Sequence, residues 1–161
     1  MSIVTFLYKL NNLDLQPIVR KLMSKSDGSG WTFQQTEVAI ARYKMFLHLN
    51  FLFPDTPLVP TKEIDQVWHA HILADTKRYS HDCDNLFGYF LHHSSDEMQC
   101  QNQDTAFALT QALFDKFFGV AILEDIQAAP CVSLPVSACA TLPFALQPSN
   151  TQDYLTKSAF L

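Results

Sequence analysis

The stretch TFQQTEVAIARYKMFLHLNFL, residues 32–52, decides the fold of this 161-residue chain. Thr32 followed three residues later by Gln35 is a capping-box pattern, in which each side chain hydrogen bonds the other residue's backbone at the start of a helix. Apolar side chains then recur at helical spacing in two stripes. The first stripe is Val38, Ala41, Met45, Leu49 and Leu52, and the second is Ile40, Tyr43, Leu47 and Phe51. A helix that is apolar on two sides is typical of the centre of a bundle.

Three more helices are predicted around this one. Asp14 is the expected N-cap of a helix that ends before a Gly- and Ser-rich turn. Thr61 is the expected N-cap of a helix that runs to Cys83 and ends or bends near Gly88. Asp104 precedes a helix rich in phenylalanine. We therefore predict an all-α fold, a small bundle of four or more helices.

The character of the chain changes after Asp125. Residues 126–152 contain no charged side chain and include Pro130, Pro135, Pro143 and Pro148. Because regularly spaced prolines exclude a long helix, we predict a helical domain over residues 1–125 and an irregular, Pro-containing segment over residues 126–161. We expect the apolar part of that segment to pack, either on its own chain or on a partner, and the polar end to be mobile.

Composition excludes several classes of function. Hydrophobic residues make up 48% of the chain and charged residues 17%, which is typical of a globular domain. The net charge of −5 and the scattered basic residues disfavour binding to nucleic acid or to anionic membranes.

The start of the chain lacks the features of a secretory signal, and the cysteines lack a disulfide or CxxC pattern; they are Cys83, Cys100, Cys131 and Cys139. We therefore predict free thiols and a cytoplasmic location, with the host cytosol as the alternative if the chain is a secreted bacterial effector.

The run IDQVWHAHIL, residues 64–73, is the most specific motif. With the later Tyr79, Cys83, Gly88 and His92-His93, it resembles the glycine-rich-domain-containing-protein-like family of bacteria and plants. The likeness covers roughly residues 13–119. It implies an all-α domain of unknown function and brings no established reaction or catalytic residue. The chain departs from the family after His93, where Ser94-Ser95-Asp96-Glu97 replaces an aromatic, Gly-containing segment.

The histidines of this run are candidate ligands for zinc or iron, together with one cysteine. The candidate metal ligands are His69, Cys83, His92 and His93. On a single helix over residues 61–83, His69 and Cys83 would lie about 21 Å apart at ~1.5 Å per residue and could not share an ion. Two groupings remain open. One joins Cys83 to His92 or His93, and the other joins His69 to Asp65, with His48 as a third member.

The same residues also have a purely structural interpretation. Asp65 and His69 are four residues apart, as are His71 and Asp75, so each pair can hydrogen bond along a helix. Trp68 and Tyr79 fit the core, where the indole N–H needs one partner. We therefore assign structural or interaction roles to a second set of residues: Asp65, Trp68, His71, Asp75 and Tyr79.

No complete catalytic set is recognisable in the sequence, since no nucleophile and base stand at suitable spacing and no phosphate-binding loop is present. We predict a non-enzymatic protein-protein interaction module without a cofactor, an adaptor or inhibitor whose partner is another protein or a second copy of the chain. The alternative is a metal-binding protein or metal-dependent enzyme that uses zinc or iron in the His69–His93 region.

Overall fold

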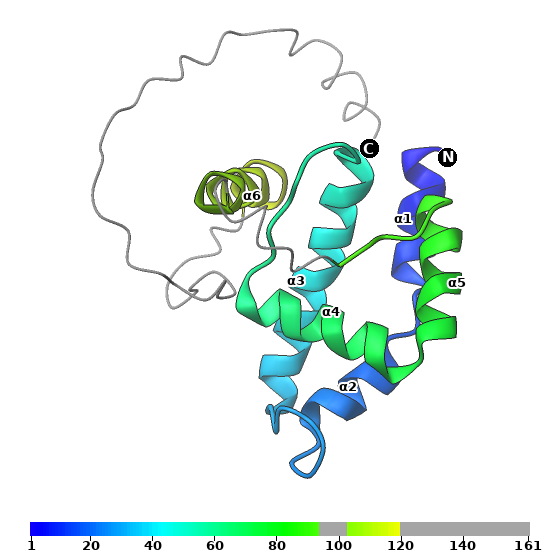
Figure 1. Ribbon diagram of the computed structural model, residues 1–161, viewed down its shortest axis with the longest axis vertical. Helices are drawn as coiled ribbons and strands as arrows, with labels where there is room; N and C mark the ends of the chain where they lie inside the picture. Colours follow the sequence, from blue (N-terminus) through cyan, green and yellow to red (C-terminus); the bar gives the residue numbers. More distant parts are fainter. Residues whose placement is uncertain (94–102, 120–161) are drawn as a thin grey trace, which may run out of the picture. The chain divides into compact units, whose positions relative to one another are not determined.

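The computed structural model describes residues 1–93 and 103–119, and within these ranges it contains helices and no strand (Figure 1). The helices are α1 (Ile3–Asn11), α2 (Gln16–Met23), α3 (Phe33–Leu52), α4 (Lys62–Ala74), α5 (Thr76–Phe87) and α6 (Gln103–Phe118). The predicted all-α fold is confirmed. The predicted boundary at residue 125 and the segment that follows it lie outside the described residues. No helix in the described part is both long and apolar enough to cross a membrane.

Helix α3 is central, as its two apolar stripes predict, because it packs against α1, α2, α4 and α6. The predicted capping box forms: the Gln35 backbone N–H donates to the Thr32 hydroxyl at 3.2 Å, and the Thr32 N–H donates to the Gln35 side chain at 2.9 Å. The first predicted stripe is wrong at its start, since Val38 is 42% exposed and Ala41 is exposed as well. The buried positions of α3 are Thr36, Ala39, Tyr43, Phe46, Leu47 and Leu49.

Helix α1 was not predicted from the sequence. It begins at Ser2, whose hydroxyl accepts the Thr5 backbone N–H, and it buries Phe6 and Leu10. The Phe6 ring stacks on Phe51 of α3 with centroids 4.0 Å apart. Apolar side chains at positions 3, 6, 7 and 10 carry the helical spacing that would have revealed it. In Figure 1, α1 runs beside α5, and the two helices are in contact.

The predicted helix from residue 61 to 83 is wrong in one respect: it is two helices that meet at Asp75. Thr61 caps α4 as expected, its hydroxyl accepting the Ile64 N–H at 3.2 Å. Asp75 then adopts an extended backbone, with φ −163° and ψ 102°. Its carboxylate accepts the backbone N–H groups of Lys77 and Arg78 at 3.0 and 3.1 Å, so it caps α5. A short polar side chain can satisfy backbone groups in this way without continuing a helix, which explains the break.

The end of α5 starts the segment that reaches the candidate site. Gly88 takes the left-handed conformation, with φ 78°, and its N–H donates to the Asp84 carbonyl at 2.9 Å. The expected helix end at this glycine is therefore confirmed. Residues 89–93, which we call the strap, continue without regular secondary structure.

Replacing Gly88 should destabilise the protein through backbone conformation alone. A Cβ at this position meets nothing within 4 Å, so no side-chain clash contributes. The Gly88→Ala variant should lose about 1–2 kcal/mol of unfolding free energy, the cost of a left-handed L-residue. The Gly88→Asn variant should lose less, because asparagine tolerates this region. Urea unfolding of the three proteins measures the difference, and equal losses for Ala and Asn would contradict the explanation.

Candidate metal site

The residues of α4 that the sequence analysis singled out lie on different sides of the helix. Asp65 and His69, four residues apart, lie on one side of α4, with 3.8 Å between an Asp65 carboxylate oxygen and His69 Nδ1. Trp68 and His71 point into the core, where both are buried. The break at Asp75 brings α5 back against α4, so residues of the two helices can bond to one another.

The strap brings His93 to Asp65, which is 28 residues earlier in the chain. His93 Nε2 donates to Asp65 Oδ1 at 2.6 Å, and the two imidazole rings of His69 and His93 have centroids 4.4 Å apart. Asp65, His69 and His93 each offer one ligand atom, and these atoms all lie within 4.8 Å of one another. We call these three residues the 65/69/93 group.

The 65/69/93 group lies at the edge of the core. The Asp65 and His93 side chains are 17% and 16% exposed, whereas His69 is 52% exposed. Two imidazoles and one carboxylate are a ligand set that suits zinc, iron and other divalent transition metals. The exposed side at His69 gives solvent access to the group, which a catalytic or exchangeable metal site needs and a closed structural site does not.

The other two candidate ligands lie outside the 65/69/93 group. His92 is exposed, and its ring contacts Phe90 with centroids 4.7 Å apart. Cys83 is buried in α5 beside Tyr79 and the backbone of Leu91. Burial raises the pKa of the Cys83 thiol, so the protonated form, a poor ligand and a poor nucleophile, is favoured.

His48, the third member expected beside Asp65 and His69, contacts the rings of Phe6 and Phe118 instead. Burial lowers its pKa, so the neutral imidazole is favoured among these aromatic neighbours. The third residue beside Asp65 and His69 is therefore His93 and not His48, which the sequence analysis had considered. No spacing rule relates His93 to Asp65, because the strap joins them only in the folded chain.

His71 has a different partner from the one expected. Asp75 caps α5, and His71 instead bonds at both ring nitrogens, to Asp82 and to Tyr43. Nε2 donates to the Asp82 carboxylate at 3.2 Å, which leaves Nδ1 to accept from the Tyr43 hydroxyl at 2.9 Å. His71 is 3% exposed, and burial lowers its pKa, although Asp82 opposes this shift. A neutral imidazole therefore joins α3, α4 and α5.

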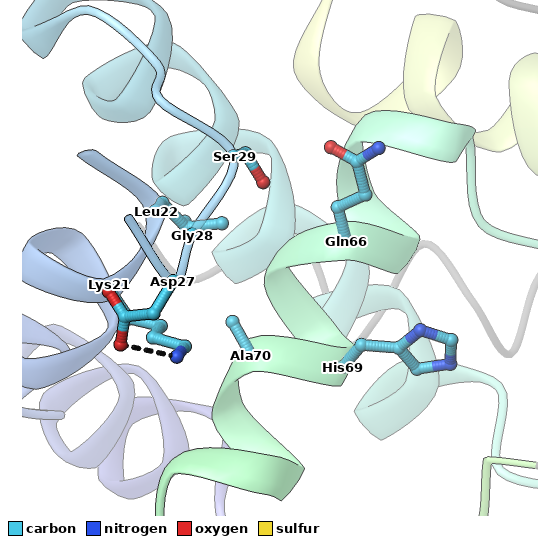
Figure 2. A pocket seen from close by; sticks show the side chains of 8 residues that line it. All are labelled: Lys21, Leu22, Asp27, Gly28, Ser29, Gln66, His69 and Ala70. Carbon is cyan, nitrogen blue, oxygen red and sulfur yellow. Dashed lines mark hydrogen bonds and ion pairs between the residues drawn. The ribbon is translucent and has the colours of Figure 1, made fainter. Parts of the chain in front are cut away.

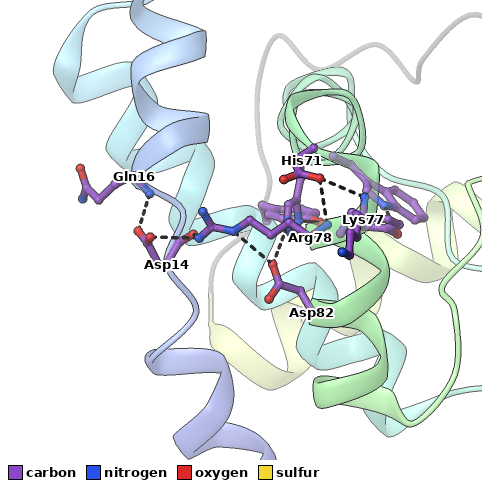
Figure 3. A network of polar contacts seen from close by, with 10 residues as sticks. Asp14, Gln16, His71, Lys77, Arg78 and Asp82 are labelled. Carbon is purple, nitrogen blue, oxygen red and sulfur yellow. Dashed lines mark hydrogen bonds and ion pairs between the residues drawn. The ribbon is translucent and has the colours of Figure 1, made fainter.

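Figure 3 shows how this network continues to the chain before α2. Arg78 lies between two carboxylates, 3.8 Å from Asp82 and 3.0 Å from Asp14. Asp14 also accepts the Gln16 backbone N–H at 3.0 Å, and this bond, followed by the one from Arg78, lowers the pKa of Asp14. The prediction that Asp14 is the N-cap is wrong by one residue, because the N-cap is Leu15. Asp14 still accepts a backbone N–H from the first residue of α2. The bonds of this network therefore join α3, α4 and α5 to the chain before α2.

Trp68 and Tyr79 are both buried in the core. The Trp68 indole N–H donates to the Tyr79 hydroxyl at 2.8 Å, which supplies the one partner that a buried indole needs. Trp68 also contacts Phe46 of α3, with ring centroids 5.4 Å apart.

An open cleft of about 290 Å³ lies between α4 on one side and the end of α2 with the turn that follows it on the other (Figure 2). Lys21 and Asp27 at its edge pair with each other at 2.7 Å, and this bond lowers the pKa of Asp27 to about 2. His69 contributes to the lining, but Figure 2 shows its imidazole turned away from the other lining residues. The cleft and the 65/69/93 group therefore share His69, whose ring lies on the side of the group.

The burial of Cys83 predicts slow alkylation. With the thiol buried and its pKa raised, iodoacetamide at pH 8 should modify Cys83 at least tenfold more slowly in the native chain than in the urea-unfolded chain. Mass spectrometry of the peptide that contains Cys83 measures both rates. Similar rates would mean that the thiol is accessible and would restore Cys83 as a candidate ligand.

Comparison with known proteins places the chain in a family. The model of the UCP032817-like family matches residues 10–118. Glycine-rich domain-containing proteins 1 and 2 of Arabidopsis thaliana are 36% and 35% identical to this chain over 88 residues. Each match covers 50% of this chain and 11% of the relative, so the chain corresponds to a small part of these longer proteins. No solved structure matches. The family model and these relatives agree with the resemblance carried by the motif at residues 64–93, and the chain belongs to the UCP032817-like family.

Proposed function

We propose that this domain binds a divalent transition-metal ion, such as zinc or iron, through Asp65, His69 and His93. The observation that carries the proposal is the convergence of three potential ligand atoms within 4.8 Å, from two segments that are far apart in the sequence. Metal binding is the alternative hypothesis of the sequence analysis, and the geometry of these three residues supports it better than it supports an interaction module.

The distances in the 65/69/93 group suit an ion after a small adjustment. In a tetrahedral zinc site with bonds of about 2.0–2.2 Å, ligand atoms stand about 3.4 Å apart. Asp65 Oδ1 lies 2.6 Å from His93 Nε2, and the other carboxylate oxygen, Oδ2, lies 3.8 Å from His69 Nδ1, so the two distances stand on either side of that value. Ion binding would replace the proton that His93 shares with Asp65, so the affinity should fall at acidic pH.

A metal-free role for the same residues makes a different prediction. The hydrogen bond from His93 to Asp65 by itself ties the strap to α4. In that case the intact chain would unfold at the same temperature with and without zinc, because a ligand stabilises a protein only when it binds the folded state preferentially. Metal affinity therefore separates the two roles.

Zinc binding should depend on His93 and not on its neighbour. The intact chain, purified without a metal column and treated with chelator, should bind one zinc ion in isothermal titration calorimetry. The His93→Ala variant should bind at least tenfold more weakly, a loss of about 1.4 kcal/mol, because only two protein ligands remain. His92→Ala is the matched control, since His92 is the adjacent histidine and lies outside the group.

Two results would contradict the proposal. One is the absence of zinc binding by the intact chain at micromolar concentrations. The other is an equal loss of affinity in the His92→Ala and His93→Ala variants, which would place the ion elsewhere. Asp65→Asn should resemble His93→Ala, because the amide is a weaker ligand than the carboxylate of Asp65 and keeps its size.

The interaction-module hypothesis stays a prediction. Its support is that the matched region forms 11% of two longer relatives, as a module within a larger protein would. The apolar side chains of Val4 and Tyr8 are exposed on α1, four residues apart. Nothing in the described part of the chain identifies what would cover them, so the 65/69/93 group is the better supported basis for a function.

A further inference from the structure

The position of His93 depends on the strap, which has no regular secondary structure of its own. A ligand carried by such a segment must be held by other contacts if it is to bind an ion with a defined geometry. The contacts of the strap with α4 and α5 therefore decide whether the 65/69/93 group exists as a site.

Tyr79 makes one of the hydrogen bonds that hold the strap, together with the bond from His93 to Asp65. Its hydroxyl donates to the Leu91 carbonyl at 2.6 Å and accepts the Trp68 indole N–H at 2.8 Å. Tyr79 is buried, with 1% of its surface exposed, so the loss of either bond would leave a buried polar group without a partner. The carbonyl that Tyr79 holds belongs to the residue two positions before His93.

Trp68 completes the support from the other side. Its ring contacts the His93 ring edge to face, with centroids 4.5 Å apart and an angle of 68°. The same indole therefore packs on the imidazole of His93 and bonds the phenol that holds Leu91. Trp68 and Asp65 both lie on α4, so two residues of one helix contact the His93 ring.

We propose that Tyr79 is a positioning residue for the metal site: its hydroxyl, bonded between Trp68 and Leu91, fixes the strap so that His93 meets Asp65 and His69. This inference rests on the proposed function in so far as it concerns metal affinity. Outer-shell groups that orient metal ligands commonly contribute 10–100-fold to affinity. The Tyr79 hydroxyl acts in this way without touching the ion.

The test compares Tyr79→Phe with Tyr43→Phe in the full chain. Each change removes one buried phenolic hydroxyl from the core, but the Tyr43 hydroxyl bonds His71 and not the strap. Cobalt(II) is the probe, because its visible absorption reports both its affinity and its coordination geometry. Tyr79→Phe should weaken cobalt binding at least tenfold and alter the absorption spectrum. Tyr43→Phe should change the affinity less than threefold, at a similar loss of melting temperature.

A second measurement needs no metal. In the metal-free protein, the indole of Trp68 should shift the NMR signals of the His93 ring protons through its ring current, since the rings are in contact. Tyr79→Phe should reduce that shift by at least half, and Tyr43→Phe should leave it unchanged. Unchanged His93 signals in Tyr79→Phe, or unchanged cobalt affinity, would overturn the positioning role. If the intact chain binds no cobalt but the His93 signals respond as expected, the positioning role stands and the proposed metal function fails.

Discussion

The extended backbone at Asp75 is the constraint on which the rest of this structure depends. It separates α4 from α5 and changes the direction of the chain, so that α5 leaves α4 at a steep angle while remaining in contact with it (Figure 1). Two hydrogen bonds then join residues eleven positions apart: a buried one from Trp68 to Tyr79 and a partly buried one from His71 to Asp82. On one continuous helix, residues eleven apart would be about 16 Å apart along the axis, at ~1.5 Å per residue, and neither bond could form. The carboxylate of Asp75 favours the break, because it satisfies the first free N–H groups of α5.

The two bonds across this turn serve different parts of the molecule. The His71 bridge extends through Tyr43 to α3 and through Asp82 to Arg78, so it ties the core helices to the chain before α2. The Trp68–Tyr79 bond extends to Leu91 and therefore reaches the strap. Buried polar groups of this kind stabilise a structure only when each has a partner. Among the described residues, no buried side-chain nitrogen or oxygen lacks one.

Local patterns predicted the local features well. The capping box at Thr32 and Gln35, the cap at Thr61 and the helix end at Gly88 depend on residues a few positions apart, and all three form as expected. The helix over residues 3–11 carries the same kind of periodicity, although it was not among the predicted helices. The break at Asp75 has no such local signal. An aspartate within an apolar periodic run is compatible with a helix surface or with a cap, and tertiary packing decides between them.

The sequence by itself determined the fold class, the central helix and the set of residues from which a site is built, since periodicity and caps act over a few residues. It also placed Asp65 and His69 on one side of a helix, four positions apart. Only the tertiary structure chose the third member of the group, His93, over His48 and Cys83. The strap's course across α4 depends on a turn at Asp75, a left-handed glycine and a phenol bonded to Leu91. Contacts between residues 28 positions apart, such as Asp65 with His93, follow from these three features together and from no local pattern.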